Sequence, residues 1–279
     1  FIARNEYNNK FVFYYFDGGF DFIEFYENLD NKEKCFHEIM ISNKFRKLYF
    51  DIDAKPNNKV TFNEMVNFIV YLKTVIISVF NKLYFINQGM EISDKNILIC
   101  QSIDNSIKID GDSKLSIKFS VHIIITGFMV KDYTECRFFA QKVIDDIYIT
   151  KYNKFIEFID TNVYAPNKSL RILDSYKPKL ENITSELELR RKKLAKSSRH
   201  FKLSDSLLTY FNGEIILNKL SDEQLIEEKY KNASNNVNTL NSDEFEDYIN
   251  ILIKNHEEKL SYFNIRETKI NDNICTIEF

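Results

Sequence analysis

The alternation of hydrophobic and polar residues in "KLYFDID" (Lys47 to Asp53) predicts a half-buried β-strand. Alternate residues of a strand share a face, so Phe50 and Ile52 would point into the core. Asp51 and Asp53 would then point together to the opposite face. Like charges held side by side repel each other, so this pair indicates either a bound cation or a strand end in free water.

The spacing of hydrophobic residues predicts two long helices and two further strands before residue 150. "TFNE" (Thr61 to Glu64) has the spacing of a capping box, and the apolar positions after it recur at helical intervals to about Phe85. A second helix is predicted over 132–149. The two strands, with a polar loop over 103–116 between them, are predicted at 96–102 and 117–126.

The remaining segments are less regular. The aromatic-rich stretch 10–26 contains the turn signal Asp17-Gly18-Gly19, which predicts a strand followed by either a second strand or a short helix. "FIEFIDTNVY" (Phe155 to Tyr164) predicts a strand that carries Asp160. Downstream we expect, in order, a charged helix over 183–202, a core-closing segment over 204–211 and, after an Asn/Ser-rich linker, an amphipathic helix over 245–260.

The composition indicates a globular protein with an uneven distribution of charge. The chain has 279 residues, 44% of them hydrophobic and 15% aromatic, enough for a sizeable core in one large or two small domains. Net charge is only −3, yet 165–202 holds eleven Lys/Arg against four Asp/Glu, and 203–279 holds seven against fifteen. This segregation favours one surface for a polyanion, with a solvated helix face as the alternative.

Two observations concern membranes and the extent of the chain. The apolar stretch that begins at Phe68 is interrupted by Lys73, Asn81 and Lys82, so we expect a buried helix and no membrane partner. The sequence begins at Phe1 without a methionine or a leader. We therefore expect a fragment of a longer protein.

Three short motifs together predict a site for a nucleotide and its metal ions. They are the acid pair Asp51 and Asp53, the strand face Lys118-x-Ser120-x-His122, and Asp160 followed by the basic residues Lys168, Arg171 and Lys177. Three carboxylates can hold two divalent ions about 4 Å apart, and hard oxygen ligands suit Mg²⁺ or Mn²⁺. Cations, a hydroxyl and an imidazole can bind the phosphates. Taken singly, each motif has an ordinary structural explanation, and it is the combination that favours the site.

In this order the motifs resemble those of the archaeo-eukaryotic primases, in particular the eukaryotic primase-polymerases and the primase domains of large DNA viruses. "KLYFDID", "KFSVH" and "FIDTNVYAPNKSLRILDSYK" carry the resemblance, which covers roughly 10–211. The third stretch is the most specific, because Val163-Tyr164, Arg171, Ser175 and Lys177 follow Asp160 as in the family's extended motif. The zinc module and the helicase that often accompany the family are not visible in this sequence.

The resemblance implies a role for each matching residue. The residues implied in catalysis and metal binding are Asp51, Asp53 and Asp160. Those implied in binding the nucleotide are Lys118, Ser120, His122, Arg171 and Lys177, with Lys168 a weaker match and Lys10, or else Arg4, as the basic residue of the N-terminal module. The residues of the charged helix that are candidate template or primer contacts are Arg190, Arg191, Lys192, Lys193, Lys196 and Arg199, with a solvated helix as the alternative.

The resemblance also implies the fold. It is α+β, with a catalytic core over 1–212 that contains an N-terminal α/β module to about residue 45 and an RRM-like mixed-sheet module over 46–212. The active site is expected in the cleft between the two modules. An acidic, mainly helical extension is expected over 213–279.

The implied function is that of a DNA primase or DNA-directed primase-polymerase. It would make and extend primers on a single-stranded DNA template from NTPs or dNTPs, by two-metal nucleotidyl transfer with Mg²⁺ or Mn²⁺, in DNA replication or damage tolerance. Implied partners include a replication helicase or a single-strand-binding protein. The location is expected to be intracellular, in the nucleus, mitochondrion or viral factory. The alternatives are a metal-dependent nuclease and a non-catalytic module that binds single-stranded nucleic acid.

Overall fold

The computed structural model describes residues 1–7, 10–55, 59–85, 88–102, 118–176, 192–195, 200–218, 267–271 and 274–278, with side chains except at 6–11 and beyond 266. The chain divides into two compact units, Phe1–Lys219 and Leu220–Phe279. In the second unit, β11 (Glu267–Asn271) and β12 (Ile274–Glu278) form an antiparallel hairpin that the sequence did not predict. The helix predicted over 245–260 lies outside the described residues.

The centre of the first unit is an antiparallel sheet with the strand order β4-β6-β5-β9. Its strands are β4 (Tyr49–Ala54), β6 (Phe119–Ile125), β5 (Ile97–Gln101) and β9 (Lys193–Leu194). The strands predicted over 47–53, 96–102 and 117–126 are therefore confirmed. The loop predicted over 103–116 lies outside the part of the chain that the structure describes.

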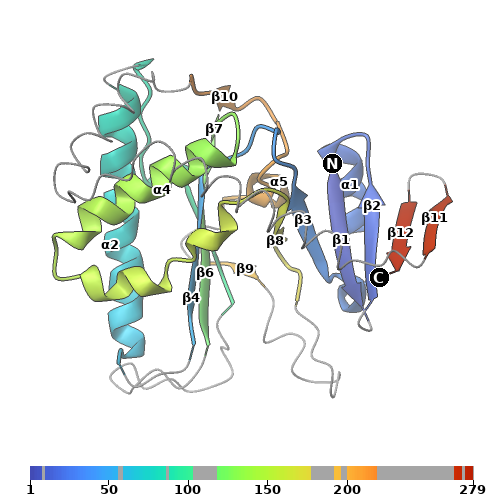
Figure 1. The fold of residues 1–279 in the computed structure, drawn as a ribbon, viewed down its shortest axis with the longest axis horizontal. Coiled ribbons are helices and arrows are strands. Elements are labelled where there is room, and N and C mark those ends of the chain that lie inside the picture. The colour runs from blue at the N-terminus through green and yellow to red at the C-terminus, as the bar shows by residue number, and fades with distance from the viewer. Residues whose placement is uncertain are drawn as a thin grey trace, which may run out of the picture. The chain divides into compact units, whose positions relative to one another are not determined.

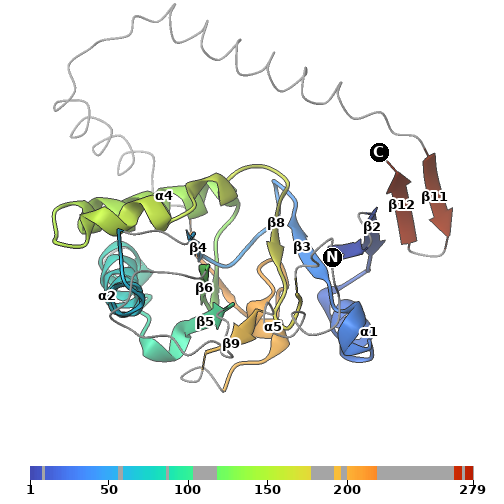
Figure 2. The ribbon, with the colours of Figure 1, turned by 90° about the horizontal axis from the view of Figure 1, so that it is seen from below.

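Two helices, α2 (Phe62–Phe80) and α4 (Tyr133–Tyr148), cover one face of this sheet (Figures 1 and 2). The capping box is confirmed, because Thr61 Oγ1 accepts from the Glu64 amide at 3.1 Å and the Glu64 carboxylate accepts from the Thr61 amide at 2.7 Å. Phe50 of β4 packs on Phe139 of α4, with ring centroids 6.0 Å apart. The apolar face of β4 is thus turned to the helices, and the acid pair to the other side.

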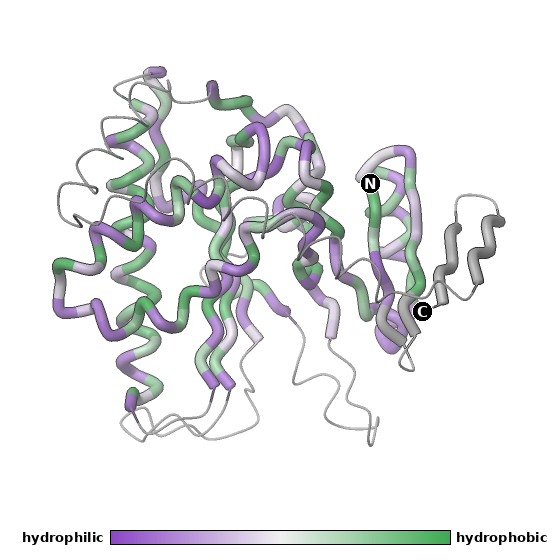
Figure 3. Tube along the Cα trace, viewed as in Figure 1, coloured by the Kyte–Doolittle hydropathy of each residue, from purple (hydrophilic) through white to green (hydrophobic). Residues whose placement is uncertain are grey.

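The most apolar helix lies in this core. Figure 3 shows that α2 alternates hydrophobic and hydrophilic positions, and its hydrophobic residues Met65, Phe68 and Leu72 are fully buried. By length and composition alone, Phe62–Phe85 is apolar enough to cross a membrane. It packs against α4 and, through Phe62 on Phe119, against the sheet, so it is a core helix, and a π-helical turn over Asn81–Phe85 continues it.

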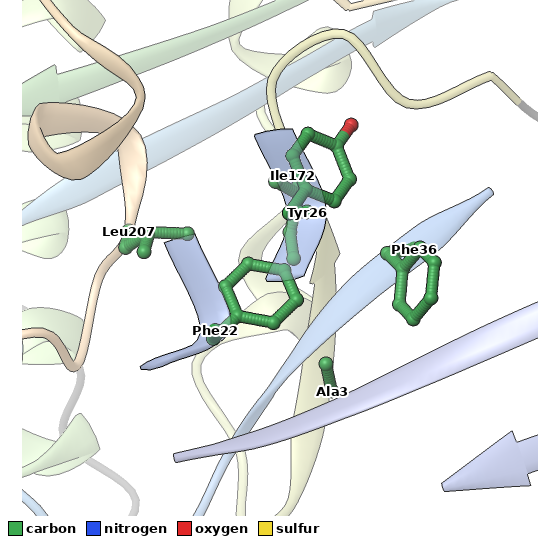
Figure 4. Close-up of a cluster of buried hydrophobic side chains, with 6 residues drawn as sticks. All are labelled: Ala3, Phe22, Tyr26, Phe36, Ile172 and Leu207. Atoms are coloured by element: carbon green, nitrogen blue, oxygen red, sulfur yellow. The ribbon is translucent and has the colours of Figure 1, made fainter. Parts of the chain in front are cut away.

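A second antiparallel sheet, in the order β2-β1-β3-β8, contains the N-terminal residues. Its strands are β2 (Lys10–Tyr15), β1 (Ile2–Tyr7), β3 (Phe36–Met40) and β8 (Lys168–Arg171). The turn after β2 leads into a short helix, α1 (Gly19–Glu27), which resolves the choice that the sequence left open. Figure 4 shows the buried cluster that joins α1 to this sheet, made by Ala3, Phe22, Tyr26, Phe36, Ile172 and Leu207.

The smaller elements connect these layers. They are the 3₁₀ turns Asn31–Glu33 and Asp94–Asn96, the helix α5 (Leu203–Ser206) and the short parallel pair β7 (Phe128–Met129) and β10 (Ile215–Ile216). Leu207 and Leu208, which follow α5, are fully buried. The prediction that 204–211 closes the core is confirmed.

One predicted strand is wrong. Residues Phe155 to Tyr164 form two 3₁₀ helices, Asn153–Phe158 and Thr161–Val163, with a single β-bridge between Ile159 and Ile52. The Asp160 carboxylate accepts from the Asn162 amide at 2.9 Å, a local bond that starts a helical turn in place of a strand. The apolar residues of this segment recur every three positions, as at Phe155 and Phe158, which is the period of a 3₁₀ helix, and Phe155 stacks on Phe68 of α2.

The buried carboxylate of Glu38 ties the segment after α5 to the N-terminal sheet. It accepts from the backbone amides of Leu208 at 2.7 Å and Thr209 at 2.6 Å, and from the Thr209 hydroxyl at 2.6 Å. Burial raises the pKa of Glu38, although these donors and Lys47 act in the opposite direction. The side chain thus joins β3 to a segment about 170 residues further along the chain.

Replacing this carboxylate should weaken the fold. Glu38→Ala leaves two buried amides without an acceptor, and we expect the free energy of unfolding to fall by about 2–4 kcal/mol. Glu27→Ala, at the exposed end of α1, should change it by less than about 0.5 kcal/mol. Urea unfolding of the two variants makes the measurement, and equal midpoints would contradict the role given to Glu38.

Candidate active site

The pairing of β4 with β6 places the acid pair beside the serine and the histidine. Asp51 lies directly opposite His122, and Asp53 lies opposite Ser120. Asp51 Oδ1 is 3.4 Å from His122 Nε2. All four side chains lie on the face of the sheet that is turned away from α2 and α4, because Phe50 and Ile52 occupy the other.

Lys118 lies at the solvent-exposed end of this row. Its ammonium lies 2.7 Å from Asp53 Oδ2, and the two side chains are 55% and 36% exposed, whereas Asp51 is 16% exposed. Burial alone would raise the pKa of Asp53, but Lys118 and the Ser120 hydroxyl hold it below its ordinary value. The site therefore opens to solvent at Asp53 and becomes buried toward Asp51.

Lys192 lies in the interior of this site, a position that the sequence did not predict for it. The prediction of a helix over 183–202 is wrong at 192–195, where the chain enters β9. Lys192 is buried and its Nζ donates to Ser120 Oγ at 2.8 Å, whereas Lys193 is exposed. The other residues predicted to contact template, Arg190, Arg191, Lys196 and Arg199, lie outside the described residues.

Buried charges control the protonation of the central pair. Burial raises the pKa of Asp51, and Lys192 is the strongest of the charges that oppose this rise. The pKa of His122 lies well below its ordinary value, first because of burial and then because Lys192, Arg171 and His37 repel a further positive charge. The imidazole is therefore neutral at pH 7 and can donate or accept a hydrogen bond.

Asp160 reaches the site through its backbone. Its amide donates to the Asp51 carbonyl at 2.8 Å, which sets the two aspartates side by side, and the negative charge of Asp160 raises the pKa of Asp51. Two tyrosines hold the segment there: Tyr49 OH donates to the Val163 carbonyl at 2.8 Å, and Tyr164 OH donates to the Tyr49 carbonyl at 2.7 Å. The Asp160 carboxylate itself accepts from Asn162.

The N-terminal sheet carries a row of basic residues, two of which, Arg171 and His37, lower the pKa of His122. Arg171 on β8 pairs with His37 on β3, and His37 pairs with Arg4 on β1. Their neighbours Ala3, Phe36 and Ile172 belong to the cluster under α1, so the row faces the other side of the sheet. His37 was missed by the sequence analysis, and the strand pattern of "FHEIM" just before "KLYFDID" is the signal that could have found it.

The structure does not bring every predicted basic residue to the acid pair. Lys168 is exposed at the opposite end of β8 from Arg171, paired with Met40. Lys177 lies outside the described residues. For Lys10, the structure describes only the backbone, which pairs with Tyr7 on β1.

The acid pair has the donor chemistry of a divalent metal site. Asp51 Oδ1 and Asp53 Oδ1 are buried, and neither accepts a hydrogen bond from the described residues, although Asp51 Oδ1 lies 3.4 Å from His122 Nε2. In that part of the chain, no group of three or more His, Cys, Asp or Glu side chains is arranged around a single metal position, since the Asp160 carboxylate caps the following turn. Two buried oxygens without a donor are hard ligands that fit Mg²⁺ or Mn²⁺, with Asp160 as the third candidate ligand.

The tyrosine that holds the Asp160 segment can be tested by its effect on stability. Tyr164→Phe leaves the buried Tyr49 carbonyl without this donor, so we expect the free energy of unfolding to fall by about 1–2 kcal/mol. Tyr148→Phe, at a 70% exposed tyrosine on α4, is the control and should have no measurable effect. Equal thermal midpoints in the two variants would show that this hydrogen bond does not hold the segment.

No protein-family model matches the chain. Among curated proteins it is similar to the "Putative helicase/primase complex protein" of African swine fever virus, with 28% identity over 181 residues in isolate Pig/Kenya/KEN-50/1950 and 28% over 191 residues in strain Badajoz 1971 Vero-adapted. Each match covers 63% of this chain, which spans only 16% and 17% of the two relatives. The similarity links the chain to viral proteins named for a helicase/primase complex.

Proposed function

We propose that the chain is the nucleotidyl-transfer module of a DNA primase or DNA-directed primase-polymerase. It would make and extend primers on single-stranded DNA from nucleoside triphosphates. The observation that supports this most directly is the β4–β6 register, which sets two carboxylates, each with one buried oxygen that accepts no hydrogen bond from the described residues, beside a neutral histidine and a serine. The similarity to helicase/primase complex proteins supports the same class of reaction.

The proposed metal ligands are Asp51, Asp53 and Asp160. Bound Mg²⁺ or Mn²⁺ would activate the attacking 3′-hydroxyl and neutralise charge on the triphosphate. Asp51 is the better shielded of the strand pair, and the positive charge of Lys192 favours its ionised form. Asp53, at the open end, is held ionised by Lys118 and so is ready to accept a cation.

The basic and polar residues would bind and orient the nucleotide. Ser120 and His122 face the acid pair, and a neutral imidazole can donate to a phosphate oxygen without the cost of burying another charge. Lys118 and Arg171 supply positive charge from the two sheets, and Lys177 and Lys168 are proposed to bind the same phosphates. A helicase or a single-strand-binding protein remains a proposed partner.

Two other functions make different predictions. A metal-dependent nuclease would degrade DNA when no nucleotides are added, and the acid pair with a single histidine is compatible with it. A non-catalytic module would bind single-stranded DNA equally well with and without Mn²⁺. Incubation with a single-stranded template, nucleotides and Mn²⁺, with and without a primer, separates all three: only the primase-polymerase gives products longer than the primer, or new products without one.

Removing one carboxylate charge should stop synthesis. Asp51→Asn keeps the shape of the side chain but weakens a metal ligand, so we expect primer extension to fall by at least about a hundredfold. Asp146→Asn, at an exposed acid on α4, is the matched control and should extend primers at the wild-type rate. If Asp51→Asn retained near-normal extension, the metal assignment would be wrong.

The histidine should affect the nucleotide more than the template. His122→Ala removes a buried group that faces the acid pair, and we expect the KM for nucleotide to rise about tenfold or more. The Kd for single-stranded DNA, measured by fluorescence anisotropy, should change by less than about twofold, because the role proposed for His122 is toward the triphosphate and not toward the DNA backbone. Loss of DNA affinity alone would contradict the phosphate role.

A further inference from the structure

Lys192 belongs to a polar row that crosses all the strands of the central sheet. β9 pairs with β5 so that Lys193 lies opposite Gln101, and β5 pairs with β6 so that Gln101 lies opposite Val121. One residue further along the same registers, Lys192 lies opposite Ser102, and the Ser102 amide donates to the Ser120 carbonyl at 2.8 Å. Ser120 in turn lies opposite Asp53. The row therefore reads Lys192, Ser102, Ser120, Asp53.

The side chain of Lys192 spans one strand to reach its partner. Adjacent strands lie about 4.8 Å apart, so the lysine stem has to cross β5 before its ammonium meets Ser120 Oγ at 2.8 Å. The residue it crosses, Ser102, is small. A lysine stem is long and flexible enough to cross one strand, and the small side chain of Ser102 leaves room for it.

The backbone of Lys192 is held on both sides. Its amide donates to the Ser175 carbonyl at 3.1 Å, and its carbonyl accepts from the Asp174 amide at 2.6 Å. Ser175 is fully buried, and its hydroxyl is bonded to Tyr26 and to the Phe36 amide. The lysine is therefore anchored to the core of the N-terminal sheet at one end and to the central sheet at the other.

We propose that Lys192 is a positioning residue of the nucleotide site, which acts by orienting the Ser120 hydroxyl. An ammonium group donates hydrogen bonds and accepts none, so it occupies a lone pair of Ser120 Oγ. The hydroxyl proton is then directed to a negative oxygen on the other side, that of Asp53 or of a bound triphosphate. Among the charges that act on Asp51, Lys192 is the strongest that favours its ionised form, so the same group orients the donor and stabilises the acid.

This inference rests on the nucleotide site proposed above, so the test must separate the two. Binding of dATP with Mn²⁺ and no template measures the site without turnover. Lys192→Met should raise the Kd about ten- to a hundredfold, because a charge-assisted contact and its ordered hydroxyl are lost together. Lys95→Met, which removes one exposed positive charge on the turn before β5, is the control and should shift the Kd by less than about twofold.

A double-mutant cycle tests whether Lys192 acts through Ser120. We expect Ser120→Ala and Lys192→Met to be strongly non-additive, with the double variant within about threefold of Lys192→Met alone. Additive losses would overturn the proposed route through the hydroxyl. Should Lys192→Met fail to fold, Lys192→Arg takes its place in the cycle, because it keeps the buried charge while its planar group meets the hydroxyl differently.

The outcomes for the two proposals differ. If the wild type binds dATP and the Kd of Lys192→Met equals that of Lys95→Met, the inference about Lys192 is wrong and the nucleotide site stands. If the wild type shows no binding of dATP with Mn²⁺, the nucleotide site itself is wrong and the role of Lys192 falls with it.

Discussion

The antiparallel pairing of β4 with β6 is the constraint on which the candidate site depends. Register places Asp51 opposite His122 and Asp53 opposite Ser120, and a slip of β4 by one residue would turn Asp51 and Asp53 toward α2 and α4. Phe50 packs on Phe139 and Ile52 is fully buried, so the hydrophobic face determines the register. The position of the acids thus follows from the burial of their apolar neighbours.

Two acids held side by side require compensation, which the fold supplies in two different ways. Lys118, at the open end, is an exposed partner of Asp53 whose contribution to stability is small in water. Lys192 is buried, which lowers the pKa of its ammonium to about 7, while the charges of Asp51 and Asp53 favour the protonated form and Ser120 accepts its hydrogen bond. The shielded part of the site is therefore close to electrically balanced, and the part near solvent is where a further cation or an anionic ligand would first be met.

The strands and helices of the central layer could be predicted from the sequence where the hydrophobic period is regular. The strands around Phe50 and Ile123 and the capped helix after Thr61 follow from local pattern alone. The backbone of Asp160 contacts that of Asp51, but from a 3₁₀ turn and not from the predicted strand, because the apolar residues of "FIEFID" recur every three positions and the Asp160 carboxylate accepts from the Asn162 amide. Lys192 could not be found, because in the sequence it is one of four consecutive basic residues and only the pairing of β9 with β5 distinguishes it.

The N-terminal sheet takes its last strand, β8, from the middle of the chain, and its core takes Ile172 and Leu207 from later still. Glu38 adds a bond from β3 to the residues that follow α5. The two layers are therefore interleaved in sequence although they are separate in space. A gene fragment that ends near residue 45 would encode three strands and a helix without the strand and the side chains that complete them, so a cut at this point would leave apolar surface of the first layer uncovered.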